Sequence, residues 1–151
     1  MTFKTVYNAS VSEEPSNQRR CRRSFPWRAV FAVVTGLGFV ATGLNHFLNP
    51  DLYIKIIPPV FPDAPLLVII SGVAEIAGGM GLLIRPLRRA AGWGLIALLI
   101  AVFPANVYMA VVPGLVPNLH IPVWLLWLRL PLQGVFIVWV WFVAIRRPAR
   151  F

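Results

Sequence analysis

The sequence is poor in the residue types that enzymes and metalloproteins most often use for chemistry. It contains one cysteine, Cys21, with two histidines and five acidic residues among its 151 positions. A single cysteine excludes an intramolecular disulfide and a dithiol relay within the chain. No second histidine or cysteine stands at metal-ligand spacing, so we expect no metal site. The sequence also has no phosphate-binding loop, dinucleotide fingerprint, Ser-His-Asp set or haem attachment motif.

Charged residues are scarce as well. They make up 13% of the chain, whereas hydrophobic residues make up 58% and the mean hydropathy is +0.75. An ordinary soluble domain has about 25% charged residues. The polar surface is too small to cover a soluble globule, so we predict a single-domain integral membrane protein that contacts the lipid bilayer.

Four apolar segments are long enough to cross a bilayer, whose core of about 30 Å requires about 20 residues of helix. They span residues 27–47, 65–84, 91–112 and 123–145. We predict an all-α fold in which an integral membrane four-helix bundle occupies residues 26–147. Between the second and third segments, Pro86 ends the helix because proline has no backbone N–H to donate.

The distribution of basic residues predicts the orientation. They precede or open the first segment, separate the second and third, and follow the last: Lys4, Arg19, Arg20, Arg22, Arg23, Arg28, Arg85, Arg88, Arg89, Arg146, Arg147 and Arg150. By the positive-inside rule, we expect both termini of this multi-pass protein to be cytoplasmic. We expect the membrane to be the plasma membrane, which in a bacterium is the inner membrane. Topology and anionic lipid explain the net charge of +9, so we expect no nucleic-acid partner.

The first 25 residues differ from the rest of the chain. They are polar and basic, and they lack the apolar core of a secretory signal. We expect residues 1–25 to form a disordered, basic cytoplasmic tail. Cys21 lies in this tail, where it is either an unmodified thiol or a palmitoylation site.

Two formal charges lie deep within the apolar segments. A charge at the centre of a membrane helix costs about 2.5–3.5 kcal/mol on insertion scales, so we predict that Glu75 and Arg129 form a buried ion pair. At 1.5 Å per helical residue, Glu75 lies roughly 15 Å and Arg129 roughly 10 Å below the outer surface. The pair either fixes the helix register alone or takes part in handling a substrate, a quinone or protons.

Other polar residues share that outer half of the membrane. Gln133 lies on the same helix face as Arg129 because the two are four residues apart. With the charged pair, these residues are predicted to line a polar pocket that opens outward: His46, Glu75, Asn106, Arg129 and Gln133. His46 is either an interfacial residue or a proton relay. Residues 48–64 are expected to lie in the interface and to cap the mouth of the bundle.

Prolines and glycines predict local geometry. Pro104 frees the carbonyl of Ile100 and Pro131 frees that of Trp127, which polar side chains of the pocket can pair with, or the two prolines are ordinary kinks. Small residues in the second segment predict a close approach between helices at Ala74, Ala77, Gly78 and Gly81.

Four motifs in order carry a family resemblance: GLNHFLNP at 43–50, SGVAEIAGGMGLL at 71–83, FPANVYMA at 103–110 and WLRLPLQ at 127–133. Together they resemble the DoxX-like family of small four-helix membrane proteins. The resemblance implies an accessory subunit of a quinone-linked or oxidative-stress redox system. It implies a quinone as the possible cofactor, together with redox partner proteins and a possible homo-oligomer. It gives no catalytic role to the five pocket residues, and the chain lacks the membrane cysteines of more distant relatives.

Three functions are therefore open. The first is a redox-associated subunit whose pocket holds a quinone, and we expect this rather than a stand-alone enzyme. The second is a transporter or permeation protein for a small solute, because broken helices with polar groups at the midplane suit that role. The third is a purely structural assembly partner. The residues alone name no substrate.

Overall fold

The computed structural model describes residues 27–112, 114–115 and 122–146. Within these residues the chain is helical, with no strand. The elements are α1 (Trp27–Leu48), α2 (Pro50–Lys55), α3 (Ala64–Leu83), α4 (Arg88–Ala101), α5 (Phe103–Val111), α6 (Val123–Val140) and the π-helix η1 (Trp141–Ile145). The predicted tail, Cys21 and His120 lie outside the described residues.

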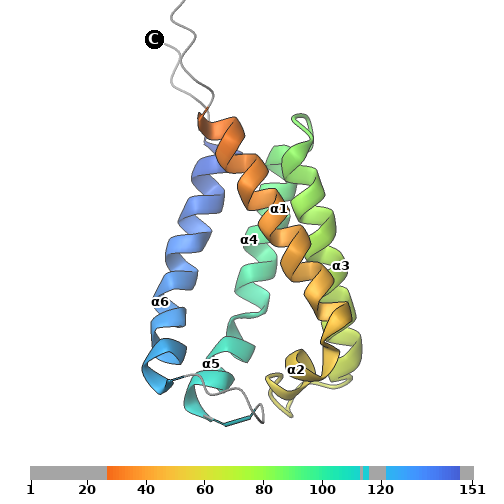
Figure 1. Cartoon of the computed structure of the whole chain (residues 1–151), viewed down its shortest axis with the longest axis vertical. Helices are drawn as coiled ribbons and strands as arrows, with labels where there is room; N and C mark the ends of the chain where they lie inside the picture. Colours follow the sequence, from red (N-terminus) through yellow and green to blue (C-terminus); the bar gives the residue numbers. More distant parts are fainter. Residues whose placement is uncertain (1–26, 113, 116–121, 147–151) are drawn as a thin grey trace, which may run out of the picture.

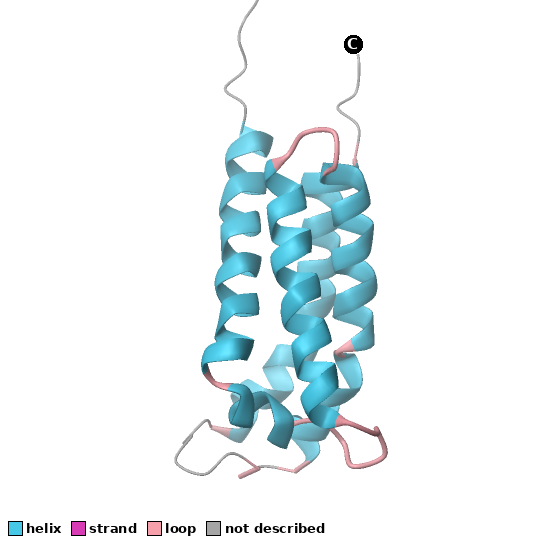
Figure 2. Ribbon diagram, turned by 90° about the vertical axis from the view of Figure 1, so that its right-hand side faces the viewer, coloured by secondary structure: helices cyan, strands magenta, loops and turns pink. Residues whose placement is uncertain are grey.

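Four helical segments are long and apolar enough to cross a membrane, and they lie side by side (Figures 1 and 2). Their bounds are Trp27–Leu48, Ala64–Leu83, Arg88–Val111 and Val123–Ile145. The predicted all-α bundle is confirmed to this extent. Many large hydrophobic side chains are exposed on the outside of the bundle, such as Val34, Trp93 and Val138. Such a surface suits contact with lipid chains rather than with water.

Both ends of the described chain lie at one end of the bundle. Arg28 at the start of α1 donates from Nη2 to the carbonyl of Phe142, 2.7 Å away, and to that of Arg146. The turn between α3 and α4 lies at this end too (Figure 1). We call it the basic end, because it carries Arg28, Arg85, Arg88, Arg89 and Arg146. The opposite end, which contains α2, is the α2 end.

The helices pack tightly in the basic half. The core there is a cluster of buried apolar residues from α1, α3, α4, α6 and η1: Phe39, Leu82, Leu95, Ile96, Val140, Ala144 and Ile145. A second, smaller cluster joins the residue after α2 to α5 and α6 at the α2 end: Ile56, Met109, Ala110 and Leu126. Between the two clusters, the interior is not filled by side chains.

Glycines set the spacing of α1 and α3. A Cβ added to Gly36 would lie 2.7 Å from the Gly79 carbonyl oxygen, and one added to Gly43 would lie 2.8 Å from that of Gly72. Backbones this close need residues without side chains. The predicted close approach at Gly78 and Gly81 also occurs, but against Leu95 and Ala91 of α4.

The third span is broken where a proline was expected to disturb it. Helix α4 ends at Ala101 and α5 begins at Phe103, with Pro104 in the first turn of α5. Proline is well accommodated there, because first-turn N–H groups have no intrahelical partner. Pro131, by contrast, lies inside α6 without ending that helix.

Candidate ligand-binding cavity

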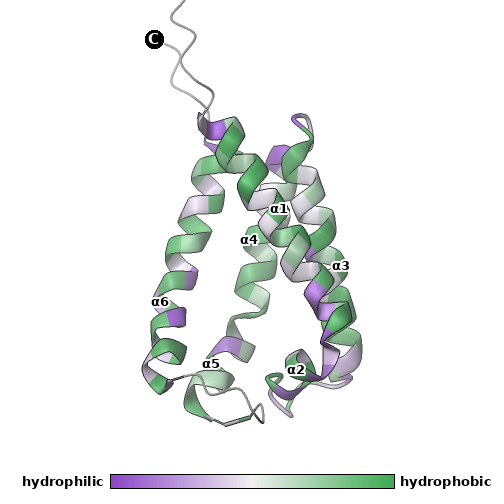
Figure 3. Cartoon of the chain, viewed as in Figure 1, coloured by the Kyte–Doolittle hydropathy of each residue, from purple (hydrophilic) through white to green (hydrophobic). Residues whose placement is uncertain are grey.

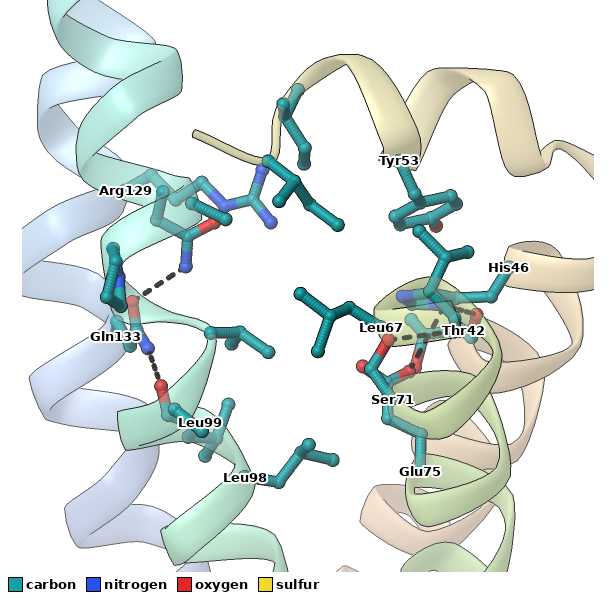
Figure 4. A pocket seen from close by; sticks show the side chains of 18 of the residues that line it. Thr42, His46, Tyr53, Leu67, Ser71, Glu75, Leu98, Leu99, Arg129 and Gln133 are labelled. Atoms are coloured by element: carbon teal, nitrogen blue, oxygen red, sulfur yellow. Dashed lines mark hydrogen bonds and ion pairs between the residues drawn. The ribbon is translucent and has the colours of Figure 1, made fainter. Parts of the chain in front are cut away.

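A cavity of about 1020 Å³ lies between the two apolar clusters, in the half of the bundle toward the α2 end. Helices α1 and α3 form one wall, and α4, α5 and α6 form the other (Figure 4). Residues 53–61, from α2 and the segment after it, contribute to the lining near the α2 end, in line with the cap expected for residues 48–64. All five predicted pocket residues line this cavity: His46, Glu75, Asn106, Arg129 and Gln133.

The polar lining is concentrated rather than scattered. Figure 3 shows hydrophobic residues along most of the four spans, with hydrophilic patches on α6, on α5 and on the α1–α3 pair in the half toward α2. The lining is otherwise apolar, with side chains such as Phe39, Leu98 and Phe136. An apolar chamber with a few polar groups is the usual form of a small-molecule site.

On the first wall, the imidazole of His46 lies beside the carboxyl group of Glu75. His46 Nδ1 lies 3.8 Å from Glu75 Oε2, and both side chains are largely buried. The same Nδ1 lies 2.9 Å from the Thr42 carbonyl oxygen. A carbonyl oxygen only accepts, so we assign the proton to Nδ1, which leaves Nε2 as an acceptor when the ring is neutral.

The His46 ring is held from its other side by Tyr53. The two rings stack with centroids 3.7 Å apart and an interplanar angle of 20°. Asn45 Nδ2 donates to the Tyr53 hydroxyl over 2.7 Å, which fixes the tyrosine. Because Tyr53 comes from α2, the cap over the cavity also positions the histidine.

Glu75 has an unfulfilled hydrogen-bonding capacity. Its Oε2 is buried and has no hydrogen-bond partner among the described residues. Leaving a buried polar group without such a bond costs about 1–3 kcal/mol, and more when the group is charged. Glu75 also lines the cavity, so a ligand donor that reaches this carboxylate would lower that cost, although Oε2 itself is covered by neighbouring atoms.

On the second wall, Asn106 and Gln133 form a connected network. Asn106 Nδ2 donates to Gln133 Oε1 over 2.8 Å, and Gln133 Nε2 donates to the carbonyl of Leu99. Leu99 lies in the last turn of α4, where carbonyls lack an intrahelical partner. The sequence predicted that the carbonyl freed for such pairing is that of Ile100, whereas Gln133 pairs with the carbonyl of Leu99, one residue earlier.

Arg129 projects into the cavity from α6 (Figure 4). Its Nη1 lies 3.8 Å from the Met109 sulfur, and its side chain is exposed. The predicted buried ion pair with Glu75 is not formed, because the one ion pair within 4.0 Å among the described residues joins Glu75 to His46. The physical reason is the cavity itself: α3 packs against α1 and α4, so Glu75 and Arg129 stand on opposite walls.

Two site features were not predicted from the sequence. The first is the stacking of Tyr53 on His46. The sequence signal for this contact is weak, because a single tyrosine in an apolar segment does not indicate which residue it contacts. The seven-residue spacing of Gly36 with Gly43, and of Gly72 with Gly79, marks the α1–α3 contact and can be found in the sequence. That contact places His46 beside Glu75.

Comparisons with known proteins identify the family. No curated protein and no solved structure matches the chain. One family model, described as "Domain of unknown function (DUF8561)", matches residues 35–144. This region covers about three quarters of the chain and contains every residue that lines the cavity. The chain therefore belongs to the DUF8561 family of domains of unknown function.

Proposed function

We propose that this protein is a small integral membrane subunit of a quinone-linked or oxidative-stress redox system, and that its cavity binds a quinone. The observation that carries the proposal is the cavity: an apolar chamber of about 1020 Å³ with His46 and Glu75 on one wall and Arg129 on the other. Its volume lies just above the range of about 300–1,000 Å³ found for ligand pockets. The resemblance to the DoxX-like family supports the same proposal.

The residues present fit a quinone. Its ring oxygens are acceptors, and Arg129 offers several guanidinium donors on the second wall. The hydroxyl of the reduced form is a donor, and the Glu75 carboxylate on the first wall offers an acceptor. When bound, the quinone supplies the redox chemistry. The protein's part is to orient the ring and to hold or move a proton at His46 and Glu75.

The proposed orientation places both termini and the basic end in the cytoplasm. The five arginines of the basic end support it, since cytoplasmic loops carry an excess of Lys and Arg. The cavity then lies in the outer half of the membrane. A redox partner protein can contact the bundle from either face of the membrane. Reporter fusions at Arg146 and in the α2 segment test this orientation, and an external location of residue 146 would refute it.

Binding of a quinone can be measured directly. Wild-type protein in lipid nanodiscs is titrated with a benzoquinone that carries a ten-carbon tail, with quenching of tryptophan fluorescence as the readout, because Trp139 lines the cavity. We expect saturable binding that Arg129→Gln weakens about tenfold, a loss of about 1.4 kcal/mol. Arg89→Gln is the matched control, since Arg89 lies at the basic end, outside the cavity lining. Equal weakening by both substitutions, or no saturable binding by wild type, would refute the proposal.

One observation favours a second candidate, a transporter or permeation protein. The third span is broken at Val102, beside the cavity, and broken helices beside midplane sites are a feature of transporters. Flux of small solutes into proteoliposomes, abolished by Glu75→Gln, would support transport. Impermeability of the wild type across a solute panel would exclude it.

A further inference from the structure

The cavity is open sideways, in the region where the helices are surrounded by lipid chains. On α1 its edge is formed by Gly38 and Thr42, and on α6 by Leu132 and Val135. All four residues are exposed, and the side chain of Val135 is 64% exposed. Figure 1 shows α1 and α6 spreading apart toward the α2 end, with α4 behind them. We call this edge of the cavity the α1–α6 opening.

Toward the basic end, the α1–α6 opening is closed by contacts between the two helices. There, α1 and α6 are joined by side-chain contacts at three successive levels. Trp139 packs edge-on against Phe31 with centroids 5.0 Å apart, its Nε1 donates to Thr35 Oγ1 over 2.9 Å, and Phe39 meets Phe136 with centroids 5.5 Å apart. Beyond Phe39, no hydrogen bond, ion pair or ring contact joins α1 to α6 within the described ranges.

Gly38 leaves space at the edge of the opening. A Cβ added at Gly38 would meet nothing within 4 Å, although the neighbouring helix glycines Gly36 and Gly43 are packed against α3. Close helix packing therefore does not explain why residue 38 lacks a side chain. A glycine in a helix interior costs about 0.5–1 kcal/mol relative to alanine, and here its effect is to widen the α1–α6 opening.

The cavity has a further edge between α3 and α5, where large aliphatic side chains line it. Leu67 extends from α3 toward the other wall in the close-up (Figure 4). Bulky aliphatic side chains continue along α3 at Ile70. The α1–α6 edge differs in carrying Gly38, where the missing side chain leaves space for a chain between the cavity and the bilayer.

We propose that the cavity takes a tailed amphiphile dissolved in the bilayer, which enters through the α1–α6 opening. Its polar head lies between Glu75 and Arg129, and its apolar tail passes beside Gly38 into the lipid. The lining supports this arrangement because Glu75 offers an acceptor and Arg129 offers donors on opposite walls, whereas the α1–α6 edge is mainly apolar. The identity of the head as a quinone rests on the proposed function; the route does not.

A photoreactive lipid tests the route without assuming a quinone. A fatty acid with a diazirine at the middle of its chain is incorporated into nanodiscs with the protein. The nanodiscs are irradiated, and the labelled peptides of the protein are mapped. Leu98 and Leu99 report entry, because they are half-buried on the α4 wall of the cavity. We expect labelling there in the wild type and at least a tenfold loss in Gly38→Trp.

One further variant makes the result decisive. Gly134→Trp is the matched control, because Gly134 on α6 has nothing within 4 Å of an added Cβ but does not line the cavity. It should label like the wild type. Absence of labelling at Leu98 and Leu99 in the wild type, unchanged labelling in Gly38→Trp, or an equal loss in Gly134→Trp would overturn the proposal.

The same variants separate the route from the quinone. If the benzoquinone with a ten-carbon tail binds and Gly38→Trp weakens it at least tenfold, while the tailless benzoquinone is unaffected, both proposals stand. If the lipid labels the cavity but no quinone competes with it, the quinone proposal fails and the route survives. If the tailed quinone binds wild type and Gly38→Trp equally, the route fails while quinone binding stands. Thermal unfolding of each variant checks that it is folded.

Discussion

Gln133 is the residue on which the second wall of the cavity depends most. It accepts a hydrogen bond from Asn106 on α5 and donates one to the Leu99 carbonyl on α4, so a single side chain of α6 holds both sides of the break at Val102. Gln133→Met keeps the length of the side chain but removes both bonds. Side-chain hydrogen bonds between membrane helices are worth about 0.6 kcal/mol on average and at most about 1.7 kcal/mol. Two of them predict a loss of about 1–3 kcal/mol in the free energy of unfolding.

Reversible unfolding in mixed micelles measures this loss, and a double-mutant cycle divides it. Asn106→Leu removes only the shared bond, so combining it with Gln133→Met should cost less than the sum of the single substitutions. We expect a coupling of about 0.5 kcal/mol or more. Leu132→Met is the control, because Leu132 is exposed and makes neither bond. A loss below about 0.5 kcal/mol for Gln133→Met, or strict additivity with Asn106→Leu, would refute this reasoning.

Two other predictions concern the first wall. Gly79→Ala should destabilise the protein by about 1–3 kcal/mol, since the added Cβ would lie 2.6 Å from a backbone oxygen of α1. Gly134→Ala should be neutral or slightly stabilising, because nothing lies within 4 Å of its added Cβ. Thermal unfolding distinguishes the two variants, and equal effects would contradict the tight α1–α3 contact. In double-mutant cycles of stability, Glu75→Gln with His46→Ala should show a coupling of about 0.5 kcal/mol or more, but Glu75→Gln with Arg129→Gln should be additive. Strong coupling only in the second cycle would mean that the ion pair predicted from the sequence forms after all.

The spans were predictable because their cause is local. A run of about 20 apolar residues must be helical to cross a bilayer, since no water is available there to satisfy the backbone. The predicted 65–84 and 123–145 therefore fall within a residue or two of Ala64–Leu83 and Val123–Ile145. The break near Pro104 was predictable for the same reason, because proline acts on its own helix.

The pairing of Glu75 could not be predicted in the same way. Depth along each helix follows from counting residues, and it correctly brought five polar residues to one cavity. Which side chains meet depends on how the helices are rotated and on which helices are neighbours. Those are set by the glycine contacts of α1 with α3, which place His46 rather than Arg129 beside Glu75.

In the proposed complex, the cavity between the two walls holds a ligand head between Glu75 and Arg129. An experimental structure of the protein in nanodiscs with the tailed benzoquinone tests it most directly. We predict density for the ring between His46 and Arg129, with the tail leaving beside Gly38. A ring bound elsewhere on the bundle, or a cavity closed by Arg129 reaching Glu75, would contradict the claim.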